Sequence, residues 1–396
     1  MISFNKTILN KGIQRFIAEN LNNNISELVL KGIPFPKEIQ QDILNQIESK
    51  NKSKKKLPTW FNTQGIYFPS KLNIEQTSSE TTAKYKSNLI SGHSLIDLTG
   101  GFGVDAYYFS KHFKQVIHCE LNQELSQIVK HNASILNTPN LTFYPENGLD
   151  ILKKLDQPFD WIYIDPSRRN DAKGKVFLLN DCLPNVPEHL DLLFSYSKNI
   201  MIKTSPLLDI SSGLNELSHV KTIHCVAVNN EVKELLWILE ANFNGQVTIK
   251  TVDIKSDKYN SFKFIYEEEK VTEADYSLPL TYLYEPNSAI LKSGAFDTIS
   301  KKLDIFKLHK HSHLYTSDKK VEFPGRHFKI ETVIPYNKKS YNKYIALKQA
   351  NITTRNFPES VNQIRNKLKI KEGGKNYLFF TTNLDNFKII ICCTKN

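Results

Sequence analysis

Apolar and polar positions along the chain change their period near residue 90. Before it, apolar residues recur at helical spacing, from Lys6 to Asn20 and again from Lys37 to Ile47. From Ser94 onwards, short apolar runs alternate with amphipathic stretches. This alternation predicts strands at Ser94–Leu98, Gln115–Leu121, Leu141–Pro145, Phe159–Ile164 and Asn199–Lys203, with helices such as Gln123–Leu136 and Pro187–Ser197 between them. A parallel sheet covered by helices on both faces follows from this pattern.

The pattern changes again after residue 220. Lys221–Val228 and Val232–Leu239 are predicted to be strands flanking a tight turn, which would give one antiparallel strand at the far side of the sheet. Dinucleotide-binding folds usually continue in parallel instead. Val247–Ile254 and Phe262–Glu268 predict a closing strand pair. The remaining chain mixes strands with short helices; its predicted elements are a helix at Phe296–Phe306, strands at Phe328–Ile334, Tyr377–Thr382 and Phe387–Cys392, and a helix at Ser360–Leu368.

The first strand runs into a glycine-rich turn, Asp97-Leu-Thr-Gly100-Gly101-Phe-Gly103, which leads into a helix. A strand, a glycine turn and a helix let the backbone approach a nucleotide closely. A dinucleotide site keeps a pyrophosphate at the helix N-terminus, where a carboxylate is unwelcome. S-adenosylmethionine (SAM) carries no phosphate but has a cationic sulfonium and an ammonium group. Asp97 at the strand end therefore favours SAM, with Gly101 and Gly103 making room for it.

Two further strand ends carry polar residues suited to the same ligand. Glu120 lies at the end of the second strand, where a carboxylate can accept hydrogen bonds from ribose hydroxyls. Asn147 follows the third strand, in Pro145-Glu146-Asn147-Gly148. Asn147 or Glu146 can hydrogen-bond the adenine edge, and the alternative is a simple turn and helix cap, since Asn-Gly is a common turn pair. We expect Asp105 to cap the helix after the glycine turn.

The fourth strand ends in Asp165-Pro166-Ser167-Arg168-Arg169, the most discriminating motif. Proline ends the strand ladder and fixes the turn. The turn would direct carbonyl groups and the Asp165 carboxylate at an acceptor amine. Four basic residues next to this turn suggest phosphate contacts, with a solvated loop as the alternative; they are Arg168, Arg169, Lys173 and Lys175. Lys203 ends the fifth strand and Ser205 lies just after it; for both, a substrate-lining role and a structural role at the strand end are open.

These motifs together resemble class I SAM-dependent methyltransferases over roughly residues 75–270. The whole chain is similar to bacterial methyltransferases with a small ferredoxin-like insert and a THUMP-like C-terminal domain. The resemblance implies a Rossmann-like, seven-stranded α/β sheet with a helical N-terminal region and small α+β C-terminal domains. The expected organisation is a helical region at 1–90, a methyltransferase domain at 91–272, a ferredoxin-like domain at 273–318 and an RNA-binding THUMP-like domain at 319–396.

The chain departs from the family pattern at several positions. Thr99 stands where the first glycine of the loop is usual, and Ser167 and Arg168 replace a proline and an aromatic residue of the catalytic turn. An aromatic residue there would stack on a flipped base, so adenine-N6 methylation of DNA is disfavoured. The stretch after the fifth strand lacks the cysteine nucleophile that uridine-C5 enzymes need.

The composition indicates the class of binding partner and the cellular compartment. The net charge of +11 suits a polyanion such as RNA. Five scattered cysteines without a C-x-x-C pair suggest a reducing, cytoplasmic compartment, and no apolar run reaches the length of a membrane span.

Three further motifs have simple interpretations. His309-Lys-His311-Ser-His313 is expected to be exposed chain and not a metal site. The run Lys50–Lys56 is either a solvated helix end or an RNA contact. Thr77-Ser-Ser-Glu80 is expected to be a capping box.

The sequence therefore predicts a SAM-dependent methyltransferase acting on a base nitrogen of tRNA or rRNA. Its predicted catalytic residues are Asp165, Pro166, Ser167 and Arg168, and its predicted cofactor-binding residues are Asp97, Thr99, Gly101, Gly103, Glu120 and Asn147. A non-catalytic RNA-binding scaffold is the alternative that Ser167 and Arg168 motivate. A methyltransferase for protein or small molecules is a third.

Overall fold

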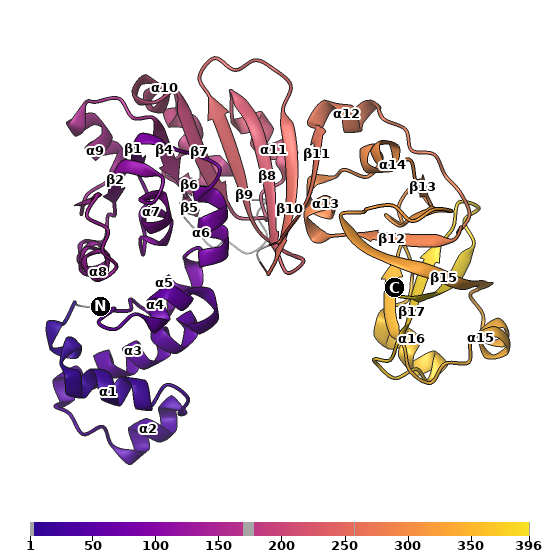
Figure 1. The fold of residues 1–396 in the computed structure, drawn as a ribbon, viewed down its shortest axis with the longest axis horizontal. Helices are drawn as coiled ribbons and strands as arrows, with labels where there is room; N and C mark the ends of the chain where they lie inside the picture. The colour runs from indigo at the N-terminus through magenta and orange to yellow at the C-terminus, as the bar shows by residue number, and fades with distance from the viewer. Residues whose placement is uncertain (1–3, 169–177, 257, 396) are drawn as a thin grey trace. The chain divides into compact units, whose positions relative to one another are not determined.

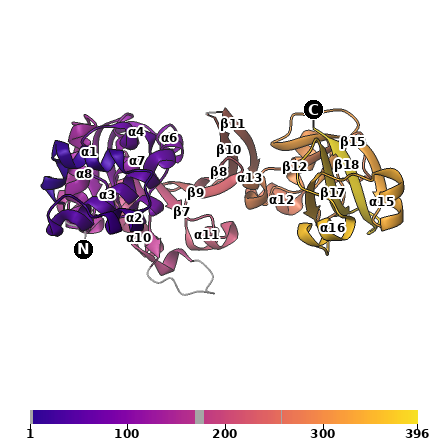
Figure 2. The ribbon, with the colours of Figure 1, turned by 90° about the horizontal axis from the view of Figure 1, so that it is seen from below.

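The structure is a computed structural model that describes residues 4–168, 178–256 and 258–395 (Figure 1, Figure 2). The basic positions Arg169, Lys173 and Lys175 lie outside the described residues, as does the side chain of Arg168. The chain divides into two compact units. The first comprises Met1–Lys221 and Lys233–Asn244, and the second comprises Thr222–Val232 and Gly245–Asn396.

A twisted sheet forms the centre of the first unit. Within this unit, the strands of the sheet run in the order β3-β2-β1-β4-β7-β9. They are β1 (Gly92–Asp97), β2 (Phe113–Cys119), β3 (Leu141–Tyr144), β4 (Trp161–Ile164), β7 (Asn199–Thr204) and β9 (Glu231–Glu240). The first five are parallel, and β9 is antiparallel to β7, with Ile202 opposite Trp237. The predicted parallel strands and an antiparallel strand after them are thus confirmed, but β9 is not the last strand of the sheet as predicted, because the sheet order continues beyond it.

Helices connect these strands across both faces. They are α7 (Val104–Phe109), α8 (Gln123–Ile135), α9 (Gly148–Leu155), α10 (Val186–Tyr196) and α11 (Ile210–Glu216). The direction of travel through the sheet reverses between β3 and β4, and parallel crossovers are right-handed. The crossover helices α7 and α8 therefore cover one face, and α10 lies on the other (Figure 2). The reversal places the loops after β1 and β4 next to each other, which is where such folds bind ligands.

The N-terminal region is helical, as predicted. It comprises the 3₁₀ helix η1 (Lys6–Leu9), α1 (Lys11–Glu19), α2 (Ile25–Lys31), α3 (Lys37–Lys56), α4 (Pro58–Asn62), α5 (Lys71–Gln76) and α6 (Glu80–Ser87). The lysine run forms the last turns of α3, where cations complement the helix dipole. The predicted capping box is wrong. Ser79, and not Thr77, caps α6, because its hydroxyl accepts the N–H of Thr82.

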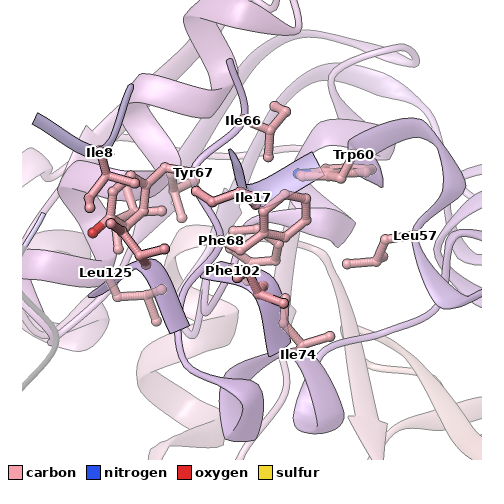
Figure 3. Packing of buried hydrophobic residues seen from close by; sticks show 14 of the residues in the cluster. Ile8, Ile17, Leu57, Trp60, Ile66, Tyr67, Phe68, Ile74, Phe102 and Leu125 are labelled. Carbon is pink, nitrogen blue, oxygen red and sulfur yellow. The ribbon is translucent and has the colours of Figure 1, made fainter. Parts of the chain in front are cut away.

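The N-terminal helices share one hydrophobic core with the helices that cover the sheet. Figure 3 shows Trp60, Phe68 and Ile74 gathered around Phe102, which belongs to the glycine-rich loop. Leu125 of α8 joins the same cluster. The ring centroids of Trp60 and Phe102 are 6.4 Å apart. The N-terminal region is consequently part of the packing that supports the loop after β1.

The second unit begins with three strands. These are β8 (Val220–Val228), β10 (Thr248–Lys255) and β11 (Lys258–Ile265), and the first two residues of β8 belong to the first unit. β10 is parallel to β8 and antiparallel to β11. The predicted strand pair is confirmed, although its second strand ends at Ile265 because α12 (Tyr266–Val271) starts there.

A second sheet fills the rest of this unit, in the order β13-β14-β12-β15-β18-β17-β16. Its strands are β12 (Tyr282–Pro286), β13 (Phe306–Lys307), β14 (Tyr315–Ser317), β15 (Gly325–Pro335), β16 (Asn351–Arg355), β17 (Asn376–Thr382) and β18 (Lys388–Thr394). The helices are α13 (Ser288–Ser293), α14 (Thr298–Leu303), α15 (Lys338–Tyr344) and α16 (Val361–Leu368). Strands β15, β17 and β18 and helix α16 were predicted; β16, which pairs in parallel with β17, was not.

Candidate active site

Three of the predicted site residues meet at the carboxyl edge of the first sheet. Asp97 is the last residue of β1, and Glu120 and Asp165 directly follow β2 and β4. The ladders place Asp97 opposite both His118 and Tyr163, so the three strands end level with one another. Because the strands are parallel, their carboxyl ends lie at the same edge. The sheet register thus brings these three carboxylates together.

The loop after β1 is tied to the end of β2. Gly101 has a φ of +53° and Gly103 a φ of +73°, both in the left-handed region that favours glycine. The Gly101 N–H donates to Oε2 of Glu120 at 2.9 Å. The other carboxylate oxygen, Oε1, accepts the N–H of Asn122 at 2.7 Å. Burial raises the pKa of Glu120, and these two hydrogen bonds oppose the rise. A loop and a strand end predicted to share one ligand are therefore directly connected.

Thr99 connects the same loop to the end of β4. Its Oγ1 accepts the N–H of Asp165 at 2.6 Å. Among the described residues, Thr99 is not one of those with a left-handed φ, so the position does not require glycine. A glycine would also lack the hydroxyl. The departure from the family's glycine thus has a structural reason: it joins the two loops that meet at the strand-order reversal.

Asp97 is an unusually buried carboxylate. It is 1% exposed, and its Oδ1 accepts the N–H of Thr99 at 3.0 Å. Burial raises the pKa of Asp97 well above its usual range; the Thr99 hydrogen bond opposes this rise, and the negative charges of Asp105, Asp165 and Glu120 add to it. A cationic group bound beside Asp97 would supply the positive charge that favours its ionised form.

Asn147 lies at the start of α9. Its Oδ1 accepts the N–H of Leu149 at 2.9 Å, which makes it the N-cap of that helix. The side-chain oxygen of Asn147 therefore caps the helix, as the alternative interpretation predicted. Binding of adenine by Asn147 stays a prediction. Gly148 next to it is required by packing, because a Cβ there would lie 2.3 Å from the carbonyl oxygen of Leu98.

The turn after β4 carries an ion pair. Lys203, the fifth residue of β7, donates to the carboxylate of Asp165, and the two side chains are 14% and 33% exposed. Ser167–Arg168 forms the short strand β5, which pairs with β6 (Cys182–Leu183). Pro166 is buried, while Ser167 is exposed. The turn is thus braced by a lysine on the next strand and by a short antiparallel bridge.

A fully buried lysine lies behind this turn. The Lys86 Nζ of α6 donates to both carboxylate oxygens of Glu234 on β9, at 3.0 and 2.8 Å, and is 3.2 Å from Asp105 Oδ1. Sequence reasoning missed both Lys86 and Glu234. The available signal was Glu234 itself, a charged residue directly before the apolar run Leu235-Leu236-Trp237.

The expected helix-capping role of Asp105 is wrong. Gly103 is the N-cap of α7 and has no side-chain cap. The Asp105 Oδ2 instead accepts hydrogen bonds from Ser78 Oγ and Tyr163 Oη, both at 2.8 Å. Burial alone would raise the pKa of Asp105, but Lys86 and Lys203, with these two hydrogen bonds, lower it. Asp105 is therefore the ionised centre of a buried network that reaches β4 two residues before Asp165.

The charges of this network also set the state of its lysines. Burial alone would lower the pKa of Lys203, yet the negative charges of Asp165, Glu234 and Asp105 raise it. The pKa of Lys56, at the end of α3, is instead lowered. Burial and the cations Lys203 and Lys233 lower the pKa of Lys56 to about 8. The end of the lysine run is thus electrostatically coupled to the β4–β7 edge.

A metal site and a membrane-spanning helix were sought in the described residues. Within them, no group of His, Cys, Asp and Glu side chains has the arrangement of a metal site. The histidine stretch is less exposed than expected: His311 is exposed, but His309 and His313 are half-buried. His313 stacks on Phe296 with ring centroids 3.8 Å apart, and His309 contacts Asn356 and Asn386. In the same part of the chain, no helix has the length and apolar character needed to cross a membrane.

Comparisons with known proteins identify the C-terminal modules and the whole chain. One family model, described as a ferredoxin-like domain, matches residues 282–324, and another, described as THUMP domain-like, matches residues 325–395. The predicted boundaries at residues 273 and 319 stay predictions. A search of curated proteins found no significant match.

Among solved structures, a candidate methyltransferase from Porphyromonas gingivalis W83 matches with a TM-score of 0.89 and 32% identity, over 100% of both chains. A candidate methyltransferase from Escherichia coli is 19% identical over 41% of this chain and 85% of its own, with a TM-score of 0.30. A third, from Streptococcus mutans and in complex with SAH, is 14% identical over 41% of this chain and 96% of its own, also with a TM-score of 0.30. These two are too distant to carry an argument. On the full-length match and the THUMP-like module, this chain belongs to the family of class I methyltransferases with a C-terminal THUMP-like domain.

Proposed function

We propose that this protein transfers a methyl group from SAM to a base nitrogen of tRNA or rRNA. One observation carries the proposal. The glycine loop is bonded to Glu120 through Gly101 and to Asp165 through Thr99. The residues predicted to hold SAM and the residue predicted to receive the acceptor are therefore direct neighbours, as a transfer reaction requires.

The open side of the loop fits SAM in space and in chemistry. A Cβ built on Gly101 would meet no heavy atom nearer than Thr99 O at 3.9 Å, so the backbone is accessible there. Each oxygen of Glu120 accepts one N–H and retains capacity for a ribose hydroxyl. Leu121 beside it is 72% exposed and offers an apolar surface to adenine. The proposed cofactor-binding residues are Asp97, Thr99, Gly101, Gly103, Glu120 and Asn147.

The proposed chemistry depends on positioning. When bound, SAM would supply a methyl carbon on a cationic sulfur, and the acceptor nitrogen would bond to that carbon as the carbon–sulfur bond broke. Asp165 accepts an N–H of the acceptor and so orients its lone pair. Pro166, Ser167 and Arg168 shape the turn around it. The proton lost by the nitrogen passes to the Asp165 carboxylate or to water.

RNA is the proposed acceptor because of charge and of the C-terminal module. The net charge is +11, and Arg168, Arg169, Lys173 and Lys175 follow the catalytic turn in sequence. Residues 325–395 match a THUMP-like model, a module that the family resemblance associates with RNA. All five cysteines lie within the described residues, are buried and form no disulfide, which supports the proposed cytoplasmic location.

Calorimetry with SAM tests the cofactor site. The wild-type protein is expected to bind SAM, and Asp97→Ala to lose binding because the ammonium group loses its carboxylate. Asp165→Ala is expected to bind SAM and to transfer no methyl group. Asp150→Ala, an exposed aspartate in the first turn of α9, is the matched control and should behave as wild type. Folded wild-type protein that does not bind SAM would refute the proposal.

Radiolabelled SAM identifies the acceptor. The protein is incubated with total RNA, and separately with total protein, from cells in which its gene has been deleted. Label in the RNA fraction is expected. Label in the protein fraction alone would indicate a protein methyltransferase. Label in neither fraction would favour a scaffold that kept the fold, the alternative that Ser167 and Arg168 motivate.

A further inference from the structure

Asp165 faces a lysine on the neighbouring strand. The β4–β7 ladder ends with Ile164 opposite Ile202, which sets Lys203 beside Asp165 at the carboxyl edge. Within the described parts of the chain, Lys203 is the side chain that bonds to the Asp165 carboxylate. Lys203 is 14% exposed, so the pair lies in a partly desolvated setting where an ion pair is stronger than on an open surface.

We propose that Lys203 is a positioning residue, which holds the Asp165 carboxylate in the orientation that receives the methyl acceptor. This inference rests on the proposed function, because it assumes that Asp165 contacts the acceptor. It concerns the side chain of Asp165 and not the fold of the turn. The ion pair engages one carboxylate oxygen, Oδ2, and leaves Oδ1 for the acceptor N–H.

The backbone of the turn is held by other groups. The Asp165 N–H donates to Thr99 Oγ1 at 2.6 Å, and Pro166 fixes the next φ. Ser167 and Arg168 pair with Leu183 and Cys182. Loss of the lysine charge should therefore leave the turn and the glycine loop in place while freeing the carboxylate to rotate.

Lys203 also interacts electrostatically with the buried carboxylates behind the turn. It lies in the field of three carboxylates, on the β4 turn, on β9 and on α7; they are Asp165, Glu234 and Asp105. Lys86 balances the two buried ones, since it bonds Glu234 and lies 3.2 Å from Asp105. The positive charges of Lys86 and Lys203 thus offset the negative charges of Asp105, Asp165 and Glu234. Among the described side chains, removing Lys203 would take away the cation that bonds Asp165 and would leave the negative charge of Asp97 near it.

A purely structural ion pair and a positioning pair predict different kinetics. If Lys203 only stabilised the strand ends, its loss would lower the amount of folded protein, and the remaining folded protein would turn over normally. If Lys203 positions Asp165, its loss lowers kcat in folded protein that still binds SAM. Its effect also vanishes when Asp165 cannot act, because Lys203 works through Asp165.

The test compares Lys203→Met, Lys203→Arg, Asp165→Asn and the Asp165→Asn/Lys203→Met double variant. Lys221→Met is the matched control, because it removes the same charge and an ion pair, with Glu240, whose side chains are 47% and 43% exposed. SAM affinity is measured by calorimetry. The kcat and KM for methyl transfer are measured with total RNA from cells lacking the gene.

We expect Lys203→Met to keep the wild-type SAM affinity and to lose kcat by about 10²-fold, as misplacement of a positioned group does. Lys203→Arg should recover much of this loss, because it keeps the charge. The double variant should be no slower than Asp165→Asn, and Lys221→Met should match wild type. If Lys203→Met does not fold, Lys203→Gln, which keeps an N–H donor, replaces it with the same expectations and a smaller loss.

Wild-type kcat in a folded Lys203→Met or Lys203→Gln variant would overturn the inference. A double variant much slower than Asp165→Asn would do so as well. Neither result would affect the proposed function. A wild-type protein that transfers no methyl group to RNA would instead refute the proposed function, and the inference with it.

Discussion

The ring of His118 lies directly beneath the glycine-rich loop. A Cβ on Gly100 would come within 2.3 Å of His118 Nε2, and a Cβ on Gly103 within 2.5 Å of Val129 Cγ1. Contacts below 3.0 Å require something to move. The glycines are therefore required for packing beneath the loop, in addition to the room that they leave for a ligand above it.

Gly100→Ala should destabilise the protein by about 1–3 kcal/mol, the usual cost of overpacking a filled site. It should also weaken SAM binding, because the loop has to move away from His118. Urea unfolding and calorimetry measure the two effects. Gly12→Ala is the control, since its Cβ would meet nothing nearer than Asn10 Oδ1 at 3.4 Å on helix α1. Equal stability of the two variants would contradict the packing argument.

His118 should make stability depend on pH. Burial lowers its pKa to about 4, from an ordinary value of 6.5. Between these pH values the unfolded chain binds a proton that the folded chain does not. This contribution is therefore fully present above pH 6.5 and is lost as the pH falls towards 4. It amounts to about 3 kcal/mol by linkage.

His118→Leu should consequently lose less stability than wild type between about pH 7.5 and 4.5, as measured by urea unfolding at each pH. His224, whose pKa burial and Lys250 lower to about 3, should leave part of the pH dependence in this variant. The exposed His112→Leu is the control. If His118→Leu and His112→Leu show the same pH dependence, His118 is not the group responsible.

At the scale of elements, the N-terminal helices support the candidate site. Trp60 of α4 is 1% exposed and packs edge-on against Tyr107 of α7 at 4.9 Å. It also contacts Phe102 in the glycine loop. Lys86 of α6 reaches the same region through its ion pairs. The helices before β1 therefore contribute to the packing and to the charge balance of the loop and the turn.

Trp60→Ala should lower the free energy of unfolding by about 3–5 kcal/mol, as truncation of a buried aromatic residue does. SAM affinity should fall with it, because Phe102 loses its support. Chemical denaturation and calorimetry measure these effects, and Leu30→Ala, at a side chain that is 86% exposed, is the control. Unchanged SAM affinity in a folded Trp60→Ala variant would show that this hydrophobic core does not support the glycine-rich loop.

At the scale of the whole molecule, the ferredoxin-like and THUMP-like stretches share one sheet. β12, from the first stretch, pairs with β15, from the second. Buried Glu285 on β12 bonds Arg326 Nε at 2.7 Å and Arg355 Nη2 at 3.0 Å, on β15 and β16. The two stretches are therefore expected to unfold together.

Hydrogen exchange should show the amides of β12 and β15 opening with the same free energy. Glu285→Ala should lower both by about 2 kcal/mol, because it leaves two arginines without their carboxylate, although partial exposure moderates the loss. Asp275→Ala, which breaks the exposed pair with Lys301, is the control. A fall in β12 alone would show that the two stretches are independent.

Much of the fold and of the predicted cofactor positions was accessible from sequence. Strand and helix periodicity is local, and in a parallel sheet every strand end falls at the same edge, so the strand pattern alone places Asp97, Glu120 and Asp165 together. The antiparallel β9 followed from a short turn between two apolar runs. Helix capping was less accessible: both Thr77 and Asp105 were assigned roles that the structure gives to Ser79 and Gly103.

The charges beneath the site were decided by the tertiary structure. Lys86 bonds Glu234 across 148 residues, and Lys203 bonds Asp165 across 38. Such pairs leave no periodic or short-range signal in the chain. They form because the strand order sets β4 beside β7 and β7 beside β9, and because a desolvated charge is stable only where a partner meets it. The strand pattern in the sequence thus places the three carboxylates at one sheet edge, whereas the lysine partners of Asp165 and Glu234 follow from the strand order of the folded sheet.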